Sequence, residues 1–156
     1  LVGSEMCIRD SNTDVYGFEK SLLETVSELP NKALILGTGG ASSAIAFVIK
    51  KLNIEFTFVS RQKSENSIEY SAVDESVLRQ HLLIINASPV GTFPKIEEAP
   101  NLPYHGLTKD HILFDLIYNP LETQFLKEGK ARGCKVSNGL KMLEYQAEKS
   151  WEIWNQ

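Results

Sequence analysis

Hydrophobic residues along this chain form short continuous runs and longer stretches with helical spacing. Continuous rather than alternating apolar runs are typical of strands in a parallel sheet that is covered on both faces. Such runs predict strands at 33–36, 56–59, 82–85, 112–116 and 134–136. Apolar residues at helical spacing, and helix end signals, predict helices at 14–29, 74–79, 122–132 and 140–154, together with an alanine-rich helix that ends at 50–51.

The predicted strands and helices alternate along the chain. This order predicts a doubly wound, Rossmann-like α/β fold with a parallel sheet and helices on both faces. In such sheets, ligands bind beyond the carboxyl ends of the strands, where the strand order reverses. Five residues are expected at such strand ends, namely Gly37, Ser60, Asn86, Leu116 and Asn138. A chain of 156 residues is long enough for one domain with a core, so one domain is the default.

A glycine-rich turn follows the first predicted strand. Gly37 and Gly39 lack Cβ atoms, so the backbone there can turn tightly and approach a pyrophosphate at the start of the next helix. Ser42 stands where such fingerprints usually have a third Gly or Ala. A turn that binds no ligand stays open as the alternative. The full predicted pyrophosphate site comprises Gly37, Thr38, Gly39, Gly40 and Ala41.

The end of the second predicted strand distinguishes between the two common dinucleotides. A carboxylate at this point hydrogen-bonds the ribose 2′-OH of NAD, whereas an Arg accommodates the 2′-phosphate of NADP. This strand ends in Ser60, Arg61, Gln62 and Lys63 and has no acid there. The sequence therefore predicts an NADP site, with Arg61 as its main determinant.

The amino-acid composition argues against several classes of function. The chain has 42% hydrophobic and 23% charged residues and a formal net charge of −4, so nucleic-acid binding is not expected. No apolar run is long enough to predict a membrane span. Cys7 and Cys134 lie far apart without a metal-ligand pattern, which favours a reducing cytoplasm and no metal site. The three histidines, His81, His105 and His111, share no ligand spacing and are expected at surface or loop positions.

Six ordered motifs give the chain a family resemblance. From Asn12 to its end, it resembles the C-terminal, NADP-binding portion of shikimate dehydrogenase. The motifs are Asn12-Thr13-Asp14 with Gly17, the turn at 37–41, Ser60-Arg61, the segment Asn86-Ala87-Ser88-Pro89-Val90-Gly91, the segment Asp115-Leu116-Ile117-Tyr118-Asn119-Pro120, and Asn138-Gly139-Leu140 with Met142 and Gln146.

The resemblance implies an NADP-dependent oxidoreductase that reversibly reduces 3-dehydroshikimate to shikimate, in the pathway to aromatic amino acids. It implies that Asp14 is the catalytic carboxylate, which bonds the substrate hydroxyls and partners a lysine, and that Tyr118 and Gln146 are further substrate contacts. Ser60, Arg61 and Lys63 would then hold the 2′-phosphate. The residues implied on the nicotinamide side are Ala87, Leu116, Gly139 and Met142.

The same resemblance implies that a substrate domain, which carries the catalytic lysine, precedes Asn12 in the family. No lysine of this chain lies in a matching motif, so this chain alone is expected to bind NADPH without oxidising shikimate appreciably. The alternative is a standalone, non-catalytic NADPH-binding module.

Two local alternatives also stay open. Asp14 stands at the start of the predicted helix at 14–29, so its carboxylate could be a structural N-cap instead of a catalytic group. Residues 1–11 show no clear periodicity and do not begin with Met. We interpret them as a remnant of cloning or gene assembly ahead of the domain at 12–156, with a native extension as the alternative.

Overall fold

The computed structural model describes residues 2–155, with side chains from Thr13 to Asn155. Its helices are α1 (Val2–Thr25), α2 (Gly40–Lys51), α3 (Glu75–Gln80), α4 (Gln124–Ala131) and α5 (Leu140–Trp154). Its strands are β1 (Lys32–Leu36), β2 (Glu55–Ser60), β3 (Ser67–Glu69), β4 (Leu83–Asn86), β5 (Ile112–Asp115) and β6 (Lys135–Ser137). Short 3-10 turns lie at η1 (Tyr70–Ala72) and η2 (Tyr104–Gly106).

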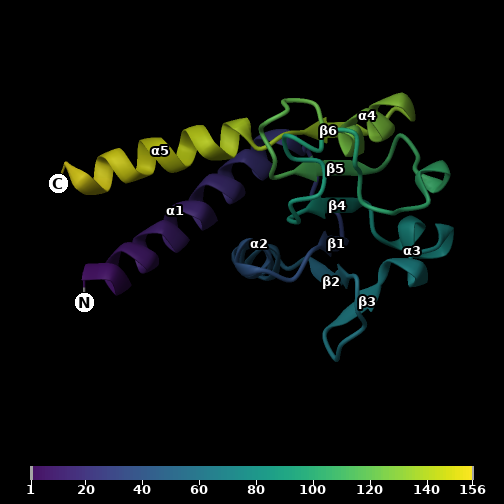
Figure 1. Ribbon diagram of the computed structural model, residues 1–156, viewed down its shortest axis with the longest axis horizontal. Helices are drawn as coiled ribbons and strands as arrows, with labels where there is room; N and C mark the ends of the chain where they lie inside the picture. Colours follow the sequence, from purple (N-terminus) through teal and green to yellow (C-terminus); the bar gives the residue numbers. More distant parts are fainter. Residues whose placement is uncertain (1, 156) are drawn as a thin grey trace.

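The six strands form one parallel sheet in the order β3-β2-β1-β4-β5-β6 (Figure 1). The chain builds outward from β1 to β3, then returns to the other side of β1 and builds outward from β4 to β6. The order therefore reverses between β1 and β4, which is where a doubly wound sheet binds ligands. This architecture confirms the predicted fold class.

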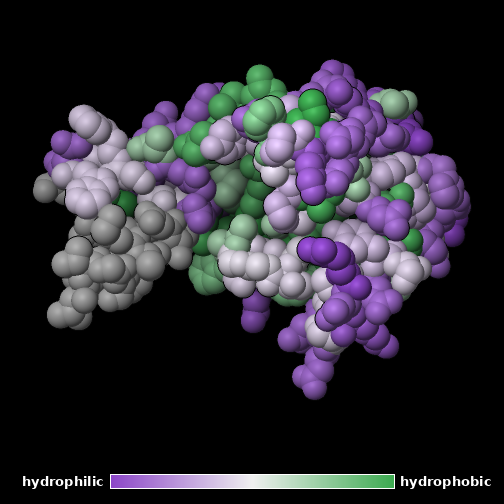
Figure 2. All heavy atoms as spheres, viewed as in Figure 1, coloured by the Kyte–Doolittle hydropathy of each residue, from purple (hydrophilic) through white to green (hydrophobic). Residues whose placement is uncertain are grey.

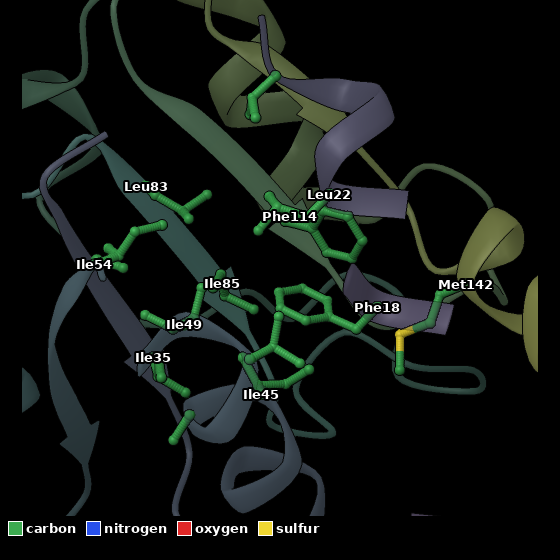
Figure 3. Packing of buried hydrophobic residues seen from close by; sticks show 14 residues of the cluster. Phe18, Leu22, Ile35, Ile45, Ile49, Ile54, Leu83, Ile85, Phe114 and Met142 are labelled. Atoms are coloured by element: carbon green, nitrogen blue, oxygen red, sulfur yellow. The ribbon is translucent and has the colours of Figure 1, made fainter. Parts of the chain in front are cut away.

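The side chains of β1 show how the two faces of the sheet are covered. Ala33 and Ile35 pack into a core cluster with Phe18 of α1 and Ile45 of α2 (Figure 3). Their neighbours in sequence, at 34 and 36, join a second cluster on the opposite face, which includes side chains of α3 and α4. Because successive strand residues point to opposite faces, a strand that is buried on both sides must be apolar throughout.

The first helix differs from its predicted bounds. The apolar side chains of the predicted helix at 14–29 do pack into the core, from Val15 to Leu29, but the helix itself spans Val2–Thr25. Val26 and Leu29 reach the core from non-helical backbone, so apolar spacing alone placed the end of the helix too late. Asp14 lies inside α1 and not before its first turn, so the N-cap interpretation is wrong.

The strand β3 was not predicted. It has three residues, Ser67 to Glu69, and its only strongly apolar one is Ile68, so no periodicity marks it. It forms by parallel pairing with β2, in the register Phe58↔Ser67. In Figure 1 the loop between β2 and β3 projects from the edge of the sheet, and in Figure 2 hydrophilic residues cover that projection.

His111 lies in the loop before β5, as predicted, but it is buried, whereas two tryptophans of α5 are exposed. His111 is 1% exposed, because its Nε2 lies 2.7 Å from the Leu78 carbonyl oxygen and its Nδ1 accepts from Thr108 N–H at 3.0 Å. Trp151 and Trp154 on α5 are 70% and 64% exposed. The cause is that α5 runs beside α1 away from the sheet (Figure 1).

Candidate dinucleotide-binding site

Two adjoining cavities lie at the carboxyl ends of β1, β2 and β4. The first has a volume of about 860 Å³ and the second about 500 Å³. Ala87, Ser88 and Pro89 line both, so the cavities form one cleft over the point where the strand order reverses. The first is lined by Gly37, Thr38, Gly39, Ser60, Arg61, Gln62, Lys63, Ser64, Ser67, Tyr70, Val90, Ala99, Pro100 and Asn101, and the second by Ala41, Thr92, Phe93, Leu116, Ile117, Tyr118 and Asn119.

The glycine-rich turn presents bare backbone to this cleft. Gly37 has φ +106°, a left-handed conformation that favours glycine, and its N–H donates to the Val59 carbonyl at 2.8 Å. Gly39 is the N-cap of α2 and makes no side-chain cap hydrogen bond, and α2 has no acid in its first turn. A Cβ atom on Gly39 or Gly40 would meet nothing within 4 Å. The start of α2 is therefore open to an anion, which its first N–H groups and its dipole favour.

Ser42 occupies the third position of the glycine fingerprint. That position needs a small residue because helix and strand pack closely there. Ser42 is 1% exposed and belongs to the inward face of α2, and its hydroxyl has no hydrogen-bond partner among the described residues. Serine is small enough for the close packing, so the departure from Gly or Ala leaves the turn intact.

The loop after β2 makes the first cavity positively charged. Arg61 and Lys63 both line it, and its lining contains no Asp or Glu. Among residues 13–155, neither Arg61 nor Lys63 takes part in an ion pair. Tyr70 completes this end, and burial raises its pKa while the Arg61 charge lowers it. In a chain of net charge −4, this cavity is suited to a negatively charged ligand group.

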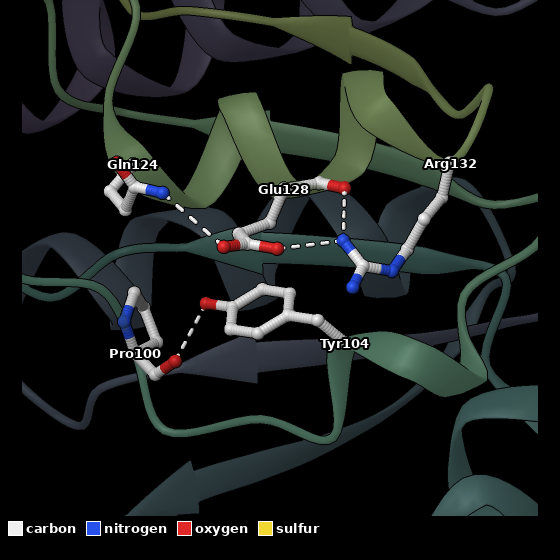
Figure 4. A network of polar contacts seen from close by, with 5 residues as sticks. All are labelled: Pro100, Tyr104, Gln124, Glu128 and Arg132. Atoms are coloured by element: carbon white, nitrogen blue, oxygen red, sulfur yellow. Dashed lines mark hydrogen bonds and ion pairs between the residues drawn. The ribbon is translucent and has the colours of Figure 1, made fainter.

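Tyr104 holds the wall of the first cavity at Pro100 (Figure 4). Its hydroxyl donates to the Pro100 carbonyl oxygen at 2.6 Å, and its ring packs edge-on against Phe125 with centroids 6.5 Å apart. Burial, followed by the Glu128 charge, raises the pKa of Tyr104, so the hydroxyl stays protonated and remains a donor. Because Phe125 belongs to α4, the ring packing ties Tyr104 to that helix, whose Glu128 is bound by Arg132 at 2.6 Å.

A buried polar network lies beneath the cleft at the ends of β4 and β5. The Asp115 carboxylate accepts from Thr123 Oγ1 at 2.6 Å, from Ile117 N–H at 3.0 Å and from Asn86 Nδ2 at 3.2 Å. Asn86 in turn accepts from the Ser88 hydroxyl at 2.6 Å. Burial raises the pKa of Asp115 to about 6, although the hydrogen bonds oppose that shift. The network fixes the loop at 86–90, whose residues 87–89 line both cavities, and the loop at 115–123, whose residues 116–119 line the second cavity.

Asp14 and Gln146 meet where α1 and α5 pack together. Gln146 Nε2 donates to Asp14 Oδ1 at 2.6 Å. The helices approach closely because Gly17 lies between them, where a Cβ atom would come within 2.6 Å of the Met142 carbonyl oxygen. Tyr118 is placed separately, 48% exposed at the rim of the second cavity. The structure thus joins two of the three predicted substrate contacts and places the third beside the cleft.

The described residues were also compared with what a membrane span and a metal site require. Among the described residues, no helix is long and apolar enough to cross a membrane. Among the side chains from Thr13 to Asn155, no group of three or more His, Cys, Asp or Glu could hold a metal ion.

Comparison with known proteins identifies the family. No family model matches the chain. A shikimate dehydrogenase (NADP(+)) of Methanococcus maripaludis is 42% identical over 159 residues, which is 92% of this chain and 56% of that protein. A solved chorismate mutase/shikimate 5-dehydrogenase fusion protein from Clostridium acetobutylicum has a TM-score of 0.80 and 38% identity, over 92% of this chain and 54% of the other. The chain belongs to the shikimate dehydrogenase family and corresponds to a part of such an enzyme.

A second solved structure shows which ligands a family member holds. Shikimate 5-dehydrogenase from Thermus thermophilus, solved in complex with NADP(H) and shikimate, has a TM-score of 0.78 and 32% identity over 91% of this chain and 56% of the other. The chain spans a little over half the length of the shikimate dehydrogenases it matches.

Two residues that the shikimate dehydrogenase resemblance assigns to the nicotinamide side line neither cavity. Gly139 packs against the backbone of Leu116, where an added Cβ atom would lie 1.9 Å from the carbonyl oxygen. Met142 is 8% exposed and belongs to the core cluster that contains Phe18 (Figure 3). Their contact with a nicotinamide stays a prediction, whereas Ala87 and Leu116 do line the second cavity.

Several lining residues escaped sequence reasoning. Ser64, Ser67 and Tyr70 belong to a polar stretch without periodicity, and Pro100 and Asn101 to a proline-rich loop, so no local pattern marked them. The buried network had a weak signal, because Asn86 and Asp115 are the polar last residues of two otherwise apolar strands.

Proposed function

We propose that this chain binds NADP(H) in the cleft over β1, β2 and β4, as the dinucleotide-binding part of an enzyme that reversibly reduces 3-dehydroshikimate to shikimate. The observation that carries the proposal is the charge at the tip of β2. Arg61 and Lys63 line a cavity that has no acidic residue, so a 2′-phosphate finds two cations there, and no carboxylate repels it.

The shape of the cleft fits an extended dinucleotide. The first cavity offers the cationic loop and the wall at 99–101 to the adenosine end, and the turn at 37–40 offers bare backbone to the pyrophosphate. The second cavity, next to Ala87 and Leu116, remains for the nicotinamide. The order of these three parts along the cleft matches the order of the groups in NADP(H).

The chemistry of ketone reduction assigns roles to the remaining residues. When bound, NADPH supplies a hydride, and the enzyme must hold the carbonyl carbon near it and a proton donor near the carbonyl oxygen. We propose that Asp14 accepts hydrogen bonds from substrate hydroxyls and orients a lysine from outside this chain, and that Gln146 holds Asp14 in place through their 2.6 Å bond. Tyr118 at the rim of the second cavity supplies a further contact to the substrate.

We also propose that the protein works in the cytoplasm. Cys134 is a free cysteine buried at 7% exposure, which suits a reducing compartment.

The test of NADP binding is Arg61→Asp, with Arg79→Asp as matched control. Arg79 is exposed on α3 and lines neither cavity, so it undergoes the same change of charge away from the site. Arg61→Asp replaces a charge-assisted bond with repulsion, so we expect about 100-fold weaker NADPH binding and a change below about threefold for NADH. The measurement is calorimetric titration of each variant with both nucleotides.

The control should bind NADPH as the unmodified chain does. Equal losses of NADPH and NADH binding in Arg61→Asp would remove Arg61 from this role. An unmodified chain that binds neither nucleotide would overturn the proposal as a whole.

A further inference from the structure

We propose that Ser67 is a positioning residue for the 2′-phosphate end of the cleft, and thereby a determinant of NADP over NAD; the inference rests on the proposed NADP binding. Ser67 lies on β3, the edge strand that follows the cationic loop. It carries no charge and does not itself have to touch the ligand. Its role is to hold the backbone from which Arg61 and Lys63 extend.

The Ser67 hydroxyl lies at the centre of a cluster that closes this loop. Its Oγ is 2.8 Å from Ser64 Oγ, 3.2 Å from Ser60 Oγ and 3.3 Å from the Gln62 carbonyl oxygen. The Ser60 hydroxyl also donates to the Gln62 carbonyl. One hydroxyl therefore contacts the residues before, within and after the segment that carries both cations.

The donors and acceptors of this cluster are consistent with one another. A serine hydroxyl has one proton to donate and two lone pairs. If Ser60 and Ser67 both donate to the Gln62 carbonyl, Ser67 Oγ remains free to accept from Ser64. Among the described residues, the side-chain hydrogen bonds that reach 61–63 all end on that carbonyl. Because Gln62 lies between Arg61 and Lys63, fixing its peptide restricts the direction of both neighbours.

Ser67 is buried, whereas the residues of the loop that it positions are exposed. Ser67 is 6% exposed, whereas Arg61, Gln62 and Lys63 are exposed. Ser67 is also anchored through its backbone, by the parallel pairing with Phe58 and by bonds with Ser64 of 3.3 and 3.4 Å. A buried, anchored hydroxyl beneath an exposed loop is an arrangement that reduces the ordering cost when the loop binds a phosphate.

The test compares two ligands that differ only in the 2′-phosphate. 2′,5′-ADP carries this group and 5′-AMP lacks it, so calorimetric titration with both isolates the 2′-phosphate from the rest of the site. In Ser67→Ala we expect about tenfold weaker binding of 2′,5′-ADP, as is typical for the loss of a hydrogen-bonded hydroxyl, and a change below about twofold for 5′-AMP.

Two further variants sharpen the result. Ser71→Ala removes an exposed hydroxyl just beyond β3 that bonds the Glu69 side chain and lines neither cavity, so the variant should bind both ligands as the unmodified chain does. Ser64→Ala removes an exposed partner of Ser67, so folding is not at risk, and it should weaken 2′,5′-ADP binding by about threefold.

The outcomes separate this inference from the proposed function. If the unmodified chain prefers 2′,5′-ADP and Ser67→Ala keeps the full preference, or if Ser67→Ala loses both ligands equally, the role of Ser67 is overturned and NADP binding stands. If the unmodified chain binds neither ligand, the proposed function fails first.

Discussion

Asp115 links the end of β5 to the loops that line the cleft, through hydrogen bonds from its carboxylate. Its carboxylate is fully buried at the end of β5 and accepts three hydrogen bonds from residues that shape the cavity floor. Burial penalises the charged form more than these bonds favour it, so the pKa rises from 3.8 to about 6.

This shift predicts a pH dependence of stability. Because the pKa is higher in the folded chain, the folded state binds the proton more tightly, and the stability from this group is complete below about pH 4 and lost as pH rises through about 6. Relative to Asp115→Asn, which cannot titrate, the unmodified chain should lose about 3 kcal/mol of unfolding free energy between about pH 4 and about pH 7. Urea unfolding of both proteins across this range measures the difference, and parallel curves would contradict the assignment.

Asparagine is a suitable replacement at this position. Its side-chain oxygen can accept from Ile117 N–H and Asn86, and its amide can donate to the Thr123 hydroxyl, which also accepts from Leu126 N–H. The variant therefore keeps the shape of the network and removes only the ionisation.

At the scale of elements, the placement of α5 depends on one glycine. Gly139 is the N-cap of α5 and has an ordinary φ of −81°, so its requirement is space and not backbone strain. An added Cβ atom would lie 1.9 Å from the Leu116 carbonyl oxygen and 2.5 Å from its carbon, and both are backbone atoms that cannot rotate away.

We therefore expect Gly139→Ala to destabilise the chain by about 3 kcal/mol, which corresponds to a melting temperature lower by about 10 °C. Gly40→Ala is the matched control, because its Cβ atom would meet nothing within 4 Å, and alanine favours helix over glycine. Its melting temperature should be unchanged or slightly higher. Equal melting temperatures for the two variants would show that α5 adjusts freely.

Particular elements show where sequence reasoning succeeds and where it fails. The strand β1 is apolar from Ala33 to Leu36 because both faces are buried there, and α2 begins directly after a glycine turn, so local signals predict both. The strand β3 forms through its pairing with β2, which no local pattern indicates. The helix α1 ends at Thr25, although apolar residues at helical spacing continue to Leu29. For the same reason Arg61 could be predicted from the strand end, whereas Ser67, which acts through tertiary contacts, could not.

At the scale of the whole molecule, the sheet order brings distant segments to one cleft. The turn after β1, the loop after β2 and the loops after β4 and β5 are far apart in sequence, yet all line the two cavities. On the side of α1 and α5, the bond between Asp14 and Gln146 joins residues 132 positions apart. The chain spans about 56% of the Methanococcus maripaludis relative, so the proposed reaction belongs to the whole enzyme, and the cofactor site can be tested on this chain.

A crystal structure of this chain grown with NADP⁺ would locate all three parts of the nucleotide at once. We expect the pyrophosphate at the first turn of α2 next to Gly39 and Gly40, the 2′-phosphate within hydrogen-bond distance of the Arg61 guanidinium, and the nicotinamide in the second cavity beside Leu116. A nucleotide bound elsewhere, or one whose 2′-phosphate points away from Arg61 into solvent, would contradict the proposed binding.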